Sequence, residues 1–270
     1  MKGRGLVPLF MVVLLLAIVT GVYLAGERDR NDADDPSDAA WSPEPRRPWQ
    51  WQLAGTPEIE PSIHIYGMDG QGTPERVVRE FGRQGKRTIC YINVGALETW
   101  RPDANRIPPG AVGQPVAGWN DEYWLDIRQI DVLSSVMARR MDECARKGFD
   151  AVEADNVDAY VHSTGFPLGP QDQIRYNTAV AALAHERGLS VALKNDVGQI
   201  AQLEPYFDFA INESCFVYDE CSDYAPFVDA NKAVFNVEYE ETPDRCRRAA
   251  ELGLSSMRKN RELDAWRKTC

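Results

Sequence analysis

Gly148-Phe149-Asp150-Ala151-Val152-Glu153-Ala154-Asp155 joins the end of a helix to a short strand that finishes on an acid. Residues 131–147 before it carry apolar side chains at helical spacing, which predicts an amphipathic helix. Gly148 can adopt the left-handed conformation that commonly ends a helix. Asp150–Ala154 is a short apolar run, as expected for a strand buried on both faces. A helix, a glycine and a strand in this order are typical of parallel α/β folds.

The same unit recurs from Trp49 onward. Helical stretches beginning at Thr73-Pro74 and spanning about 171–187 and 242–252 each stop at a glycine, and a strand follows. The predicted strands are Trp49–Leu53, Ser62–Tyr66, Arg87–Val94, Asp150–Ala154, Ser190–Lys194, Asp208–Asn212, Ala233–Val237 and Leu254–Arg258. Eight parallel strands close a barrel, so we expect an α/β fold of the (β/α)8 TIM-barrel class. A doubly wound open sheet is the alternative, but no glycine-rich dinucleotide fingerprint follows any strand.

Two irregularities interrupt the repeat. The link between the first two strands is too short for a full helix. Glu98–Arg128, after the third strand, is a long insertion that contains proline and glycine. Long loops in compact domains usually have a functional role, so we expect this insertion to contribute to the function of the protein.

The N-terminus indicates export. Lys2 and Arg4 precede an almost unbroken apolar run, Leu6–Ala25, as in a signal peptide or an N-terminal membrane anchor. We therefore divide the chain into a signal peptide or anchor at 1–26, a flexible linker at 27–48 and the barrel domain at 49–270. Either leader leaves the domain outside the cytoplasm, secreted or membrane-anchored, because the positive charge stays inside. We expect membrane contact only through an uncleaved leader.

The composition restricts the partners. Asp and Glu number 41 against 30 Lys and Arg, a formal net charge of −11, so no nucleic-acid partner is expected. Six cysteines in an exported chain predict disulfides. The spacing suggests Cys215 with Cys221, Cys246 with Cys270 in the last helical stretches, and Cys90 with Cys144. There is no C-x-x-C spacing and the three histidines are scattered, so we expect no metal and no cofactor. We expect a monomer.

Acids and amides end nearly every predicted strand. These strand ends are Met68-Asp69, Gly95–Glu98, Glu153–Asp158, Lys194-Asn195-Asp196, Asn212-Glu213-Ser214 and Glu238-Tyr239. A single acid could merely cap the next helix, but that reading explains one or two of the six. Converging carboxylates separate their pKa values by repulsion and burial, which gives one acid and one base or nucleophile. This pattern predicts glycoside hydrolysis at the carboxyl ends of the strands.

Aromatic residues and one lysine accompany these ends. Trp119, Tyr123 and Trp124 in the insertion are candidates for a substrate wall, whereas Trp49 and Tyr66 fit the barrel wall equally well. Lys194 is the one basic residue at a strand end. It could form a Schiff base, although such a lysine more often pairs with acids or binds substrate oxygen. No G-x-S-x-G is present, so a serine hydrolase is not expected.

Several separate blocks resemble one known family. They are Trp49–Leu53, Cys90–Ala96 with Glu98 and Arg101, Tyr123–Arg128, Gly148–Asp158, Leu193–Asn195, Asn212-Glu213 with Cys215, and Val237–Tyr239. In this order they are similar to glycoside hydrolase family 114, the endo-α-1,4-polygalactosaminidases. The resemblance covers about Trp49 to Arg258.

The resemblance implies an extracellular (β/α)8 enzyme that cleaves α-1,4-linked galactosamine polymers by carboxylate acid/base catalysis. By position, the family's catalytic acids fall on Asp155, which we assign as nucleophile, and on Glu213, the acid/base. The residues implied to line the subsites are Asp69, Glu98, Asp126, Asp158, Lys194, Asn195, Glu238, Tyr239 and Trp124. The sequence departs from the family at Gly67, where related chains often carry an acid two residues before the aspartate that is Asp69 here.

Two other functions stay open at this point. A non-catalytic carbohydrate-binding protein could use the same barrel. A Schiff-base lyase would use Lys194 as its nucleophile.

Overall fold

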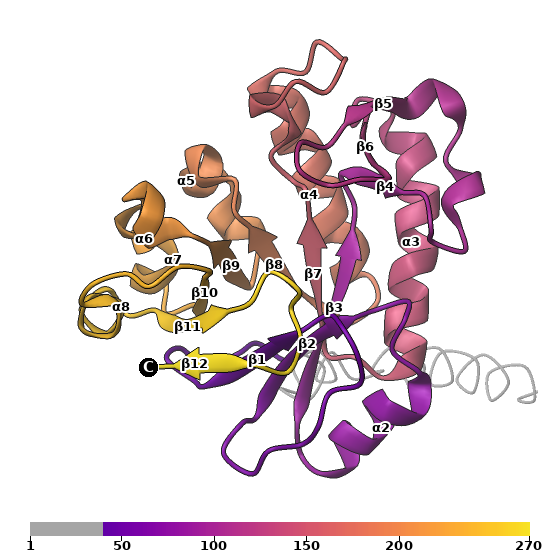
Figure 1. The fold of residues 1–270 in the computed structure, drawn as a ribbon. Helices are drawn as coiled ribbons and strands as arrows, with labels where there is room; N and C mark the ends of the chain where they lie inside the picture. Colours follow the sequence, from indigo (N-terminus) through magenta and orange to yellow (C-terminus); the bar gives the residue numbers. More distant parts are fainter. Residues whose placement is uncertain (1–39) are drawn as a thin grey trace, which may run out of the picture. The chain divides into compact units, whose positions relative to one another are not determined.

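Eight parallel strands form the wall of a barrel, each hydrogen-bonded to the next (Figure 1). In order they are β1 (Trp49–Gln52), β2 (Ile65–Asp69), β3 (Arg87–Asn93), β7 (Ala151–Asp155), β8 (Ser190–Lys194), β9 (Phe209–Glu213), β10 (Val234–Glu238) and β11 (Ser255–Lys259). A further strand, β12 (Arg267–Thr269), pairs antiparallel with β11. The computed structural model describes residues 40–270, and within them it confirms the predicted (β/α)8 class. The largest difference in a strand start is at β2, which begins at Ile65 rather than Ser62.

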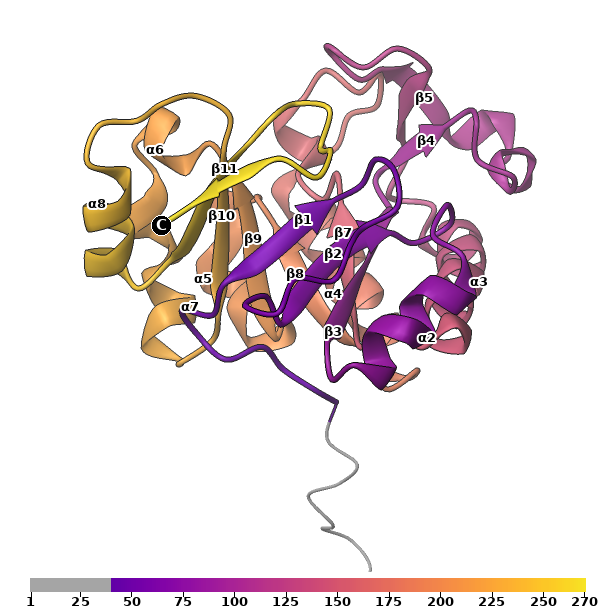
Figure 2. The same cartoon turned by 60° about the horizontal axis from the view of Figure 1, so that its bottom comes forward.

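The segment between β11 and β12 closes the barrel against β1. The carbonyl oxygen of Leu263 accepts hydrogen bonds from the backbone N–H groups of Leu53 (3.0 Å) and Ala54 (3.1 Å). The side chain of Gln50 donates to the carbonyl of Ala265 at 2.9 Å. Figure 2 shows this yellow C-terminal segment beside β1. Loop and side-chain hydrogen bonds therefore replace a strand ladder at this seam.

Helices cover the outside of the wall. The longer ones are α2 (Glu75–Arg83), α3 (Ile130–Lys147), α4 (Pro170–His185) and α8 (Arg245–Leu252), and the shorter ones are α5 (Ile200–Leu203), α6 (Cys215–Tyr218) and α7 (Ala225–Asp229). Single 3-10 turns are η1 (Ala104–Arg106), η2 (Pro109–Ala111), η3 (Ala159–Val161), η4 (Val197–Gln199), η5 (Glu204–Tyr206) and η6 (Cys221–Tyr224). As predicted, Gly148 ends α3 at φ 93° and Gly253 ends α8 at φ 79°, a conformation that glycine adopts without a Cβ clash.

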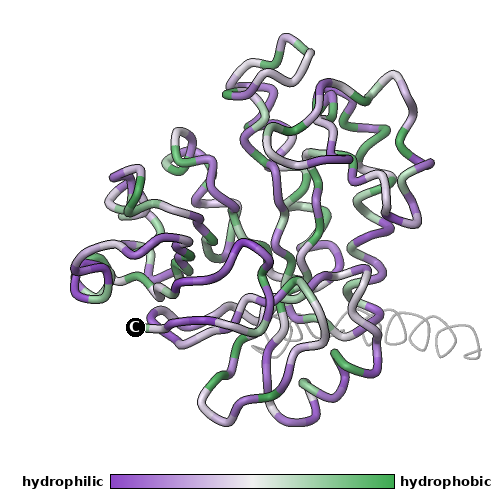
Figure 3. Tube along the Cα trace, in the orientation of Figure 1, coloured by the Kyte–Doolittle hydropathy of each residue, from purple (hydrophilic) through white to green (hydrophobic). Residues whose placement is uncertain are grey.

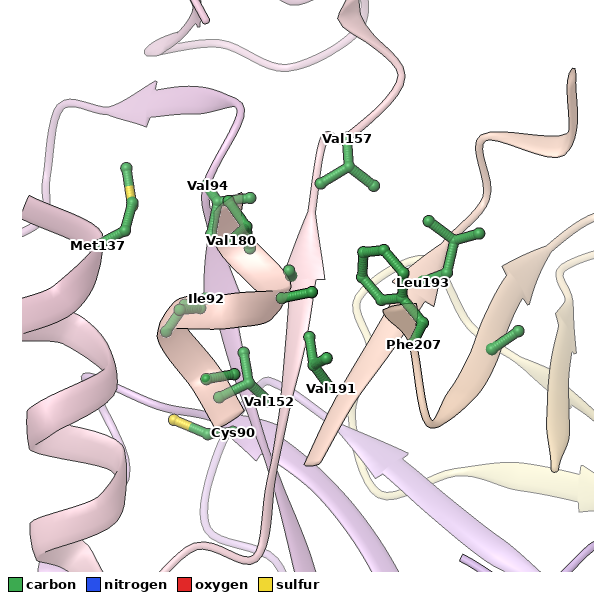
Figure 4. Packing of buried hydrophobic residues seen from close by; sticks show 14 of the residues in the cluster. Cys90, Ile92, Val94, Met137, Val152, Val157, Val180, Val191, Leu193 and Phe207 are labelled. Atoms are coloured by element: carbon green, nitrogen blue, oxygen red, sulfur yellow. The ribbon is translucent and has the colours of Figure 1, made fainter. Parts of the chain in front are cut away.

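Side chains alternate between the inside of the barrel and the layer under the helices, as the pleat requires. The inner cluster includes Trp49, Trp51, Ile65, Ile89, Phe209, Ile211, Phe235 and Met257. In the outer layer, Val152 of β7, Val191 of β8 and Val180 of α4 belong to one buried hydrophobic cluster (Figure 4). Figure 3 shows hydrophobic and hydrophilic residues alternating along α3, as its predicted amphipathic pattern requires. Each fully buried aliphatic side chain of this kind contributes about 1.5–3 kcal/mol to folding.

The insertion after β3 folds into a sheet of its own, which the sequence did not predict. Strands β4 (Ala96–Glu98), β5 (Val112–Pro115) and β6 (Glu122–Leu125) pair antiparallel in the order β4-β6-β5. At Gly95, which leads into it, a Cβ atom would lie 1.6 Å from the carbonyl oxygen of Asn156. The insertion therefore packs directly on the end of β7, at the carboxyl ends of the strands (Figure 1). We call this end of the barrel the mouth.

All six cysteines form disulfides, in the pairs that the spacing suggested. Cys90–Cys144 joins β3 to α3, Cys215–Cys221 closes a loop around α6, and Cys246–Cys270 joins α8 to the C-terminus. One expectation was wrong: Cys270 is not in a helical stretch, because the residues before it pair with β11 as strand β12.

Of the three disulfides, we expect the one between Cys90 and Cys144 to contribute the most stability. It spans 54 residues, whereas the bond between Cys215 and Cys221 spans 6. Closing the longer loop removes more chain entropy from the unfolded state, about 4 kcal/mol against about 2 kcal/mol. Urea unfolding of the two double-alanine variants measures the difference. An equal loss of unfolding free energy in both variants would contradict the loop-entropy explanation.

The predicted leader, residues 1–26, lies outside the described residues, as do residues 27–39 of the predicted linker. Between residues 40 and 270, no helix is long and apolar enough to cross a bilayer. The rest of the predicted linker contacts the barrel. The carbonyl of Trp41 accepts a hydrogen bond from the Ser190 hydroxyl, and Arg87 lies over the Trp41 ring with its guanidinium carbon 5.6 Å from the ring centre.

Candidate active site

Three neighbouring strands each end on a charged residue. Asp155 ends β7, Lys194 ends β8 and Glu213 ends β9. The residue after each has a positive φ: Asn156 at 59°, Asn195 at 51° and Ser214 at 65°. This conformation is uncommon outside glycine and is concentrated at functional sites. The chain thus turns immediately after each charged residue and leaves the three side chains together at the mouth.

The ammonium group of Lys194 contacts three carboxylates. Its Nζ lies 3.0 Å from Glu213 Oε2, 3.1 Å from Asp155 Oδ1 and 3.2 Å from Glu153 Oε1. Lys194 and Glu153 are fully buried, whereas the side chains of Asp155 and Glu213 keep 19% and 27% of their surface exposed. These four residues, the Lys194 cluster, therefore present two carboxylates to a ligand and hold the third inside the barrel.

Each carboxylate of the Lys194 cluster also accepts a hydrogen bond from an aromatic side chain. The Tyr91 hydroxyl donates to Asp155 Oδ2 at 2.9 Å, and the Tyr239 hydroxyl donates to Glu213 Oε1. The indole N–H of Trp51 donates to Glu153 Oε2 at 2.8 Å. The ring of Trp51 also lies 4.9 Å from the Lys194 ammonium, at a distance for cation–π attraction. These contacts fix the orientation of the carboxylates before any ligand binds.

The charge state of Lys194 bears on the Schiff-base alternative. Burial by itself would lower the pKa of Lys194, but the carboxylates of Asp155, Glu213 and Glu153 raise it well above its usual value. Burial raises the pKa of Glu153 to about 7, although Lys194 opposes this effect. A lysine attacks a carbonyl only as the neutral amine. Lys194 is held as the cation, which argues against a Schiff-base lyase.

A second ion-pair group joins β2 to the insertion. Arg101 lies 2.6 Å from Asp69 and 2.7 Å from Glu98. Burial raises the pKa of Glu98, and the hydrogen bonds and charge of Arg101 oppose that rise. Asp69 and Glu98, both predicted to line subsites, are therefore held together by one guanidinium group.

Glu122 of β6 lies next to this group. It faces Glu98 across the β4–β6 pair and accepts a 3.4 Å hydrogen bond from the Asn93 side chain. Burial raises the pKa of Glu122 most, and the charges of Glu98 and Asp155 raise it further, to about 7. The insertion thus brings a further carboxyl group close to Asp155.

Other predicted site residues position loops around the mouth. Asn195 Oδ1 accepts the backbone N–H of Glu213 at 3.0 Å. Asp158 lies 3.4 Å from His162, whose ring stacks on Trp124 with centroids 4.8 Å apart. Trp124 is buried, while Trp119 is 55% exposed. Trp49 and Tyr66 are buried in the barrel wall.

Two further predicted subsite residues, Asp126 and Glu238, belong neither to the Lys194 cluster nor to the ion-pair group of Arg101. Asp126 binds Arg128 at 2.7 Å, just before α3 begins. Glu238 is fully buried in the outer layer, where it accepts the backbone N–H of Phe216 at 3.1 Å. Because side chains alternate along a strand, Val237 takes the inner position on β10 and Glu238 points outward.

Gly67 departs from the family pattern for a steric reason. A Cβ atom at this position would lie 2.5 Å from Cδ1 of Trp51. The indole ring that donates to Glu153 therefore occupies the space that an acidic side chain would need.

Sequence reasoning counted Glu153 among the strand-end acids but gave no specific role to it or to Trp51, and it did not single out Tyr91 or Glu122. Glu153 lies two residues before Asp155 on β7, so the two-residue period of a strand places both side chains inside the barrel. Applying this period to β1 and β3 would also have selected Trp51 and Tyr91. Glu122 carried no such signal, because the sheet that positions it was not predicted.

Asp196, beyond the end of β8, should make stability depend on pH. One of its oxygens accepts a 3.0 Å hydrogen bond from Asn177, and the other has no partner among residues 40–270. Burial and the charge of Asp158 raise its pKa from 3.8 to about 8. Between these values the unfolded chain has lost the proton that the folded protein keeps. Rising pH should therefore lower the free energy of unfolding, by up to about 1.4 kcal/mol per pH unit.

Asp196→Asn should flatten this dependence, because the amide does not titrate. Urea unfolding of both proteins at intervals between pH 4 and pH 8 measures the two slopes. An identical slope in wild type and variant would show that Asp196 is already ionised in the folded protein.

One protein-family model, Glyco_hydro_114, described as glycoside-hydrolase family GH114, matches residues 31–270 of this chain. The chain belongs to glycoside-hydrolase family GH114. The resemblance found in the sequence is thereby confirmed, and the GH114 chain is a glycoside hydrolase.

Known proteins similar to this GH114 chain include solved structures. The crystal structure of Aspergillus fumigatus Ega3 in complex with galactosamine is 29% identical at a TM-score of 0.80, covering 86% of this chain and 98% of that one. The glycoside hydrolase domain of PelA from Pseudomonas aeruginosa shares the fold at 12% identity and a TM-score of 0.63, covering 82% and 98%. An uncharacterized protein of Deinococcus radiodurans is 26% identical over 210 residues, 70% of this chain and 67% of that protein.

Proposed function

We propose that this GH114 protein is an extracellular, retaining endo-hydrolase of α-1,4-linked galactosamine polymers. Asp155 is the nucleophile and Glu213 the acid/base. The observation that carries the proposal is the Lys194 cluster, in which one ammonium group lies between these two partly exposed carboxylates. The similarity to Ega3, whose structure contains galactosamine, supports the substrate. Three disulfides support a location in an oxidising compartment.

The spacing of the carboxylates favours retention of configuration. Asp155 Oδ1 and Glu213 Oε2 lie 3.1 and 3.0 Å from the same nitrogen. These oxygens are therefore at most about 6 Å apart, below the ~6.5–9.5 Å that inverting enzymes need for a water molecule. Retaining enzymes place the two groups about 5–5.5 Å apart.

The reaction then proceeds in two displacements. Glu213 gives a proton to the leaving oxygen while Asp155 attacks the anomeric carbon, so the glycosidic bond breaks and a glycosyl ester forms. The Glu213 carboxylate next takes a proton from water, whose oxygen displaces Asp155 and releases the sugar. Tyr91 and Lys194 orient the Asp155 carboxylate for the attack. Lys194 also contacts Glu213 at 3.0 Å, so the same ammonium group orients both reacting carboxyl groups.

The charge of the mouth suits a cationic polymer. Its carboxyl groups are those of Asp69, Glu98, Glu122, Asp155 and Glu213, with Glu153 buried below them; Arg101 pairs with Asp69 and Glu98, and Lys194 pairs with Glu153, Asp155 and Glu213. Deacetylated galactosamine units carry ammonium groups near neutral pH. An acidic mouth raises the local concentration of such a chain and speeds its association.

Mass spectrometry of products from partially deacetylated galactosaminogalactan tests the proposal. We expect the new ends of the product oligosaccharides to be galactosamine units. We expect no products from cleavage within galactose-only segments. Binding of the polymer without any cleavage would favour the non-catalytic carbohydrate-binding alternative. Cleavage within galactose-only segments would disprove the assigned substrate.

The first product should have the α configuration at its new reducing end. Two displacements at the anomeric carbon restore the α configuration of the substrate. Proton NMR in the first minutes of hydrolysis, before mutarotation, distinguishes the two anomers. An initial β signal would mean a single displacement and a carboxylate spacing wider than the structure gives.

A further inference from the structure

Glu98 and Glu122 lie directly opposite each other on β4 and β6, and they are only 3% and 7% exposed. Like charges in directly opposite positions destabilise an antiparallel pair. Arg101 compensates Glu98, since its guanidinium donates to both oxygens of that carboxylate at 2.7 and 2.8 Å. Within the described part of the chain, no basic side chain lies within ion-pair distance of Glu122. Its hydrogen bond from Asn93 is long, at 3.4 Å.

Glu122 is also close to the nucleophile. Asn93, which donates to Glu122, is the register partner of Asp155 between β3 and β7. The Tyr91 hydroxyl donates a hydrogen bond to Asp155. Burial is the largest cause of the raised pKa of Tyr91, and the charges of Asp155, Glu98 and Glu122 each raise it further. The register of β3 with β7 and of β4 with β6, together with the Asn93 hydrogen bond, therefore places Glu122 near Asp155.

We infer that Glu122 binds the protonated 2-amino group of the sugar unit that Asp155 attacks, and so selects deacetylated amino sugars. This inference rests on the proposed function and adds a specificity-determining residue to it. The amino group is on C2, next to the anomeric carbon, so its binding partner must lie beside the nucleophile. The ammonium group supplies the cation that Glu122 lacks. A hydroxyl or acetamido group at C2 supplies no cation, so the carboxyl group of Glu122 would stay uncompensated or take up a proton.

Binding of galactosamine and of galactose to the wild type and to Glu122→Gln tests the inference. Neither monosaccharide has a glycosidic bond to cleave, so calorimetric or NMR titration at pH 7 measures affinity alone. We expect the wild type to bind galactosamine more tightly than galactose. Glu122→Gln should weaken galactosamine binding by about 10- to 100-fold, the range of a hydrogen bond to a charged group, and change galactose binding by less than about 2-fold.

Two comparisons make the result decisive. Glu186→Gln removes the same charge at the exposed end of α4, where that side chain is 68% exposed, and should change neither affinity. Retained galactose binding shows that Glu122→Gln is folded. The inference is overturned if the wild type does not prefer galactosamine, if Glu122→Gln keeps the preference, or if it loses both sugars equally. If the wild type prefers galactosamine through Glu122 but cleaves no polymer, the proposed function is wrong and the inference about amino-sugar binding stands.

Discussion

Asp155→Asn and Glu213→Gln should each lower kcat on galactosamine oligosaccharides by about 10⁴-fold or more. The amide of the first variant cannot attack the anomeric carbon, and the amide of the second cannot deliver or accept the proton. Both substitutions keep the size of the side chain, so binding of the polymer should persist. Release of new reducing ends measures the rate, and Asp142→Asn on the exposed face of α3 serves as the matched control.

Azide rescue assigns the two roles. In Asp155→Ala, azide takes the place of the nucleophile, so the product should be the β-glycosyl azide. In Glu213→Ala, azide enters in the second displacement and needs no base, so the α-glycosyl azide should form with an activated aryl glycoside of galactosamine. Exchanged products would reverse the assignment of nucleophile and acid/base. Full activity in either amide variant would remove that residue from the mechanism.

The barrel could be predicted because its signals are local. Apolar runs such as Ser190–Lys194 stand out where both faces of a strand are buried, and Gly148 marks the end of α3. The sheet of the insertion has no comparable signal. Its strands are three or four residues long, as in Ala96–Glu98, and their position depends on the close approach of Gly95 to Asn156. Contacts between segments distant in sequence determine this sheet, and a pattern within one segment does not reveal them.

The sequence predicted which strand ends form the site, but it did not predict which side chains at those ends face the inside of the barrel. Asp155 and Glu213 lie at the mouth because parallel strands bring their carboxyl ends together. Glu238 also ends a strand, yet it points under α6, because the pleat gives the inner position to Val237. Which residue of a strand end faces inward depends on the register of the whole barrel, which the pattern of one strand does not give.

Lys194→Met should have the largest effect on stability. It leaves the carboxylates of Glu153, Asp155 and Glu213 without the cation that they share, and removing one partner of a buried ion pair costs about 3–5 kcal/mol. The loss of unfolding free energy should be greater at pH 8 than at pH 5. At the lower pH the carboxyl groups can take up protons and shed the uncompensated charge. Urea unfolding at both values measures the loss, and an equal loss at both would mean that packing rather than charge is responsible.

Adding Glu153→Gln to Lys194→Met separates stability from catalysis. The second substitution removes the one carboxylate of the cluster that is fully buried, so the double variant should regain part of the lost unfolding free energy. Activity should not return, because Asp155 and Glu213 still lack the cation that contacts and orients both of them. Recovery of kcat together with stability would show that Lys194 serves only to neutralise Glu153. Recovery of stability alone would show that Lys194 also acts on Asp155 and Glu213 during the reaction.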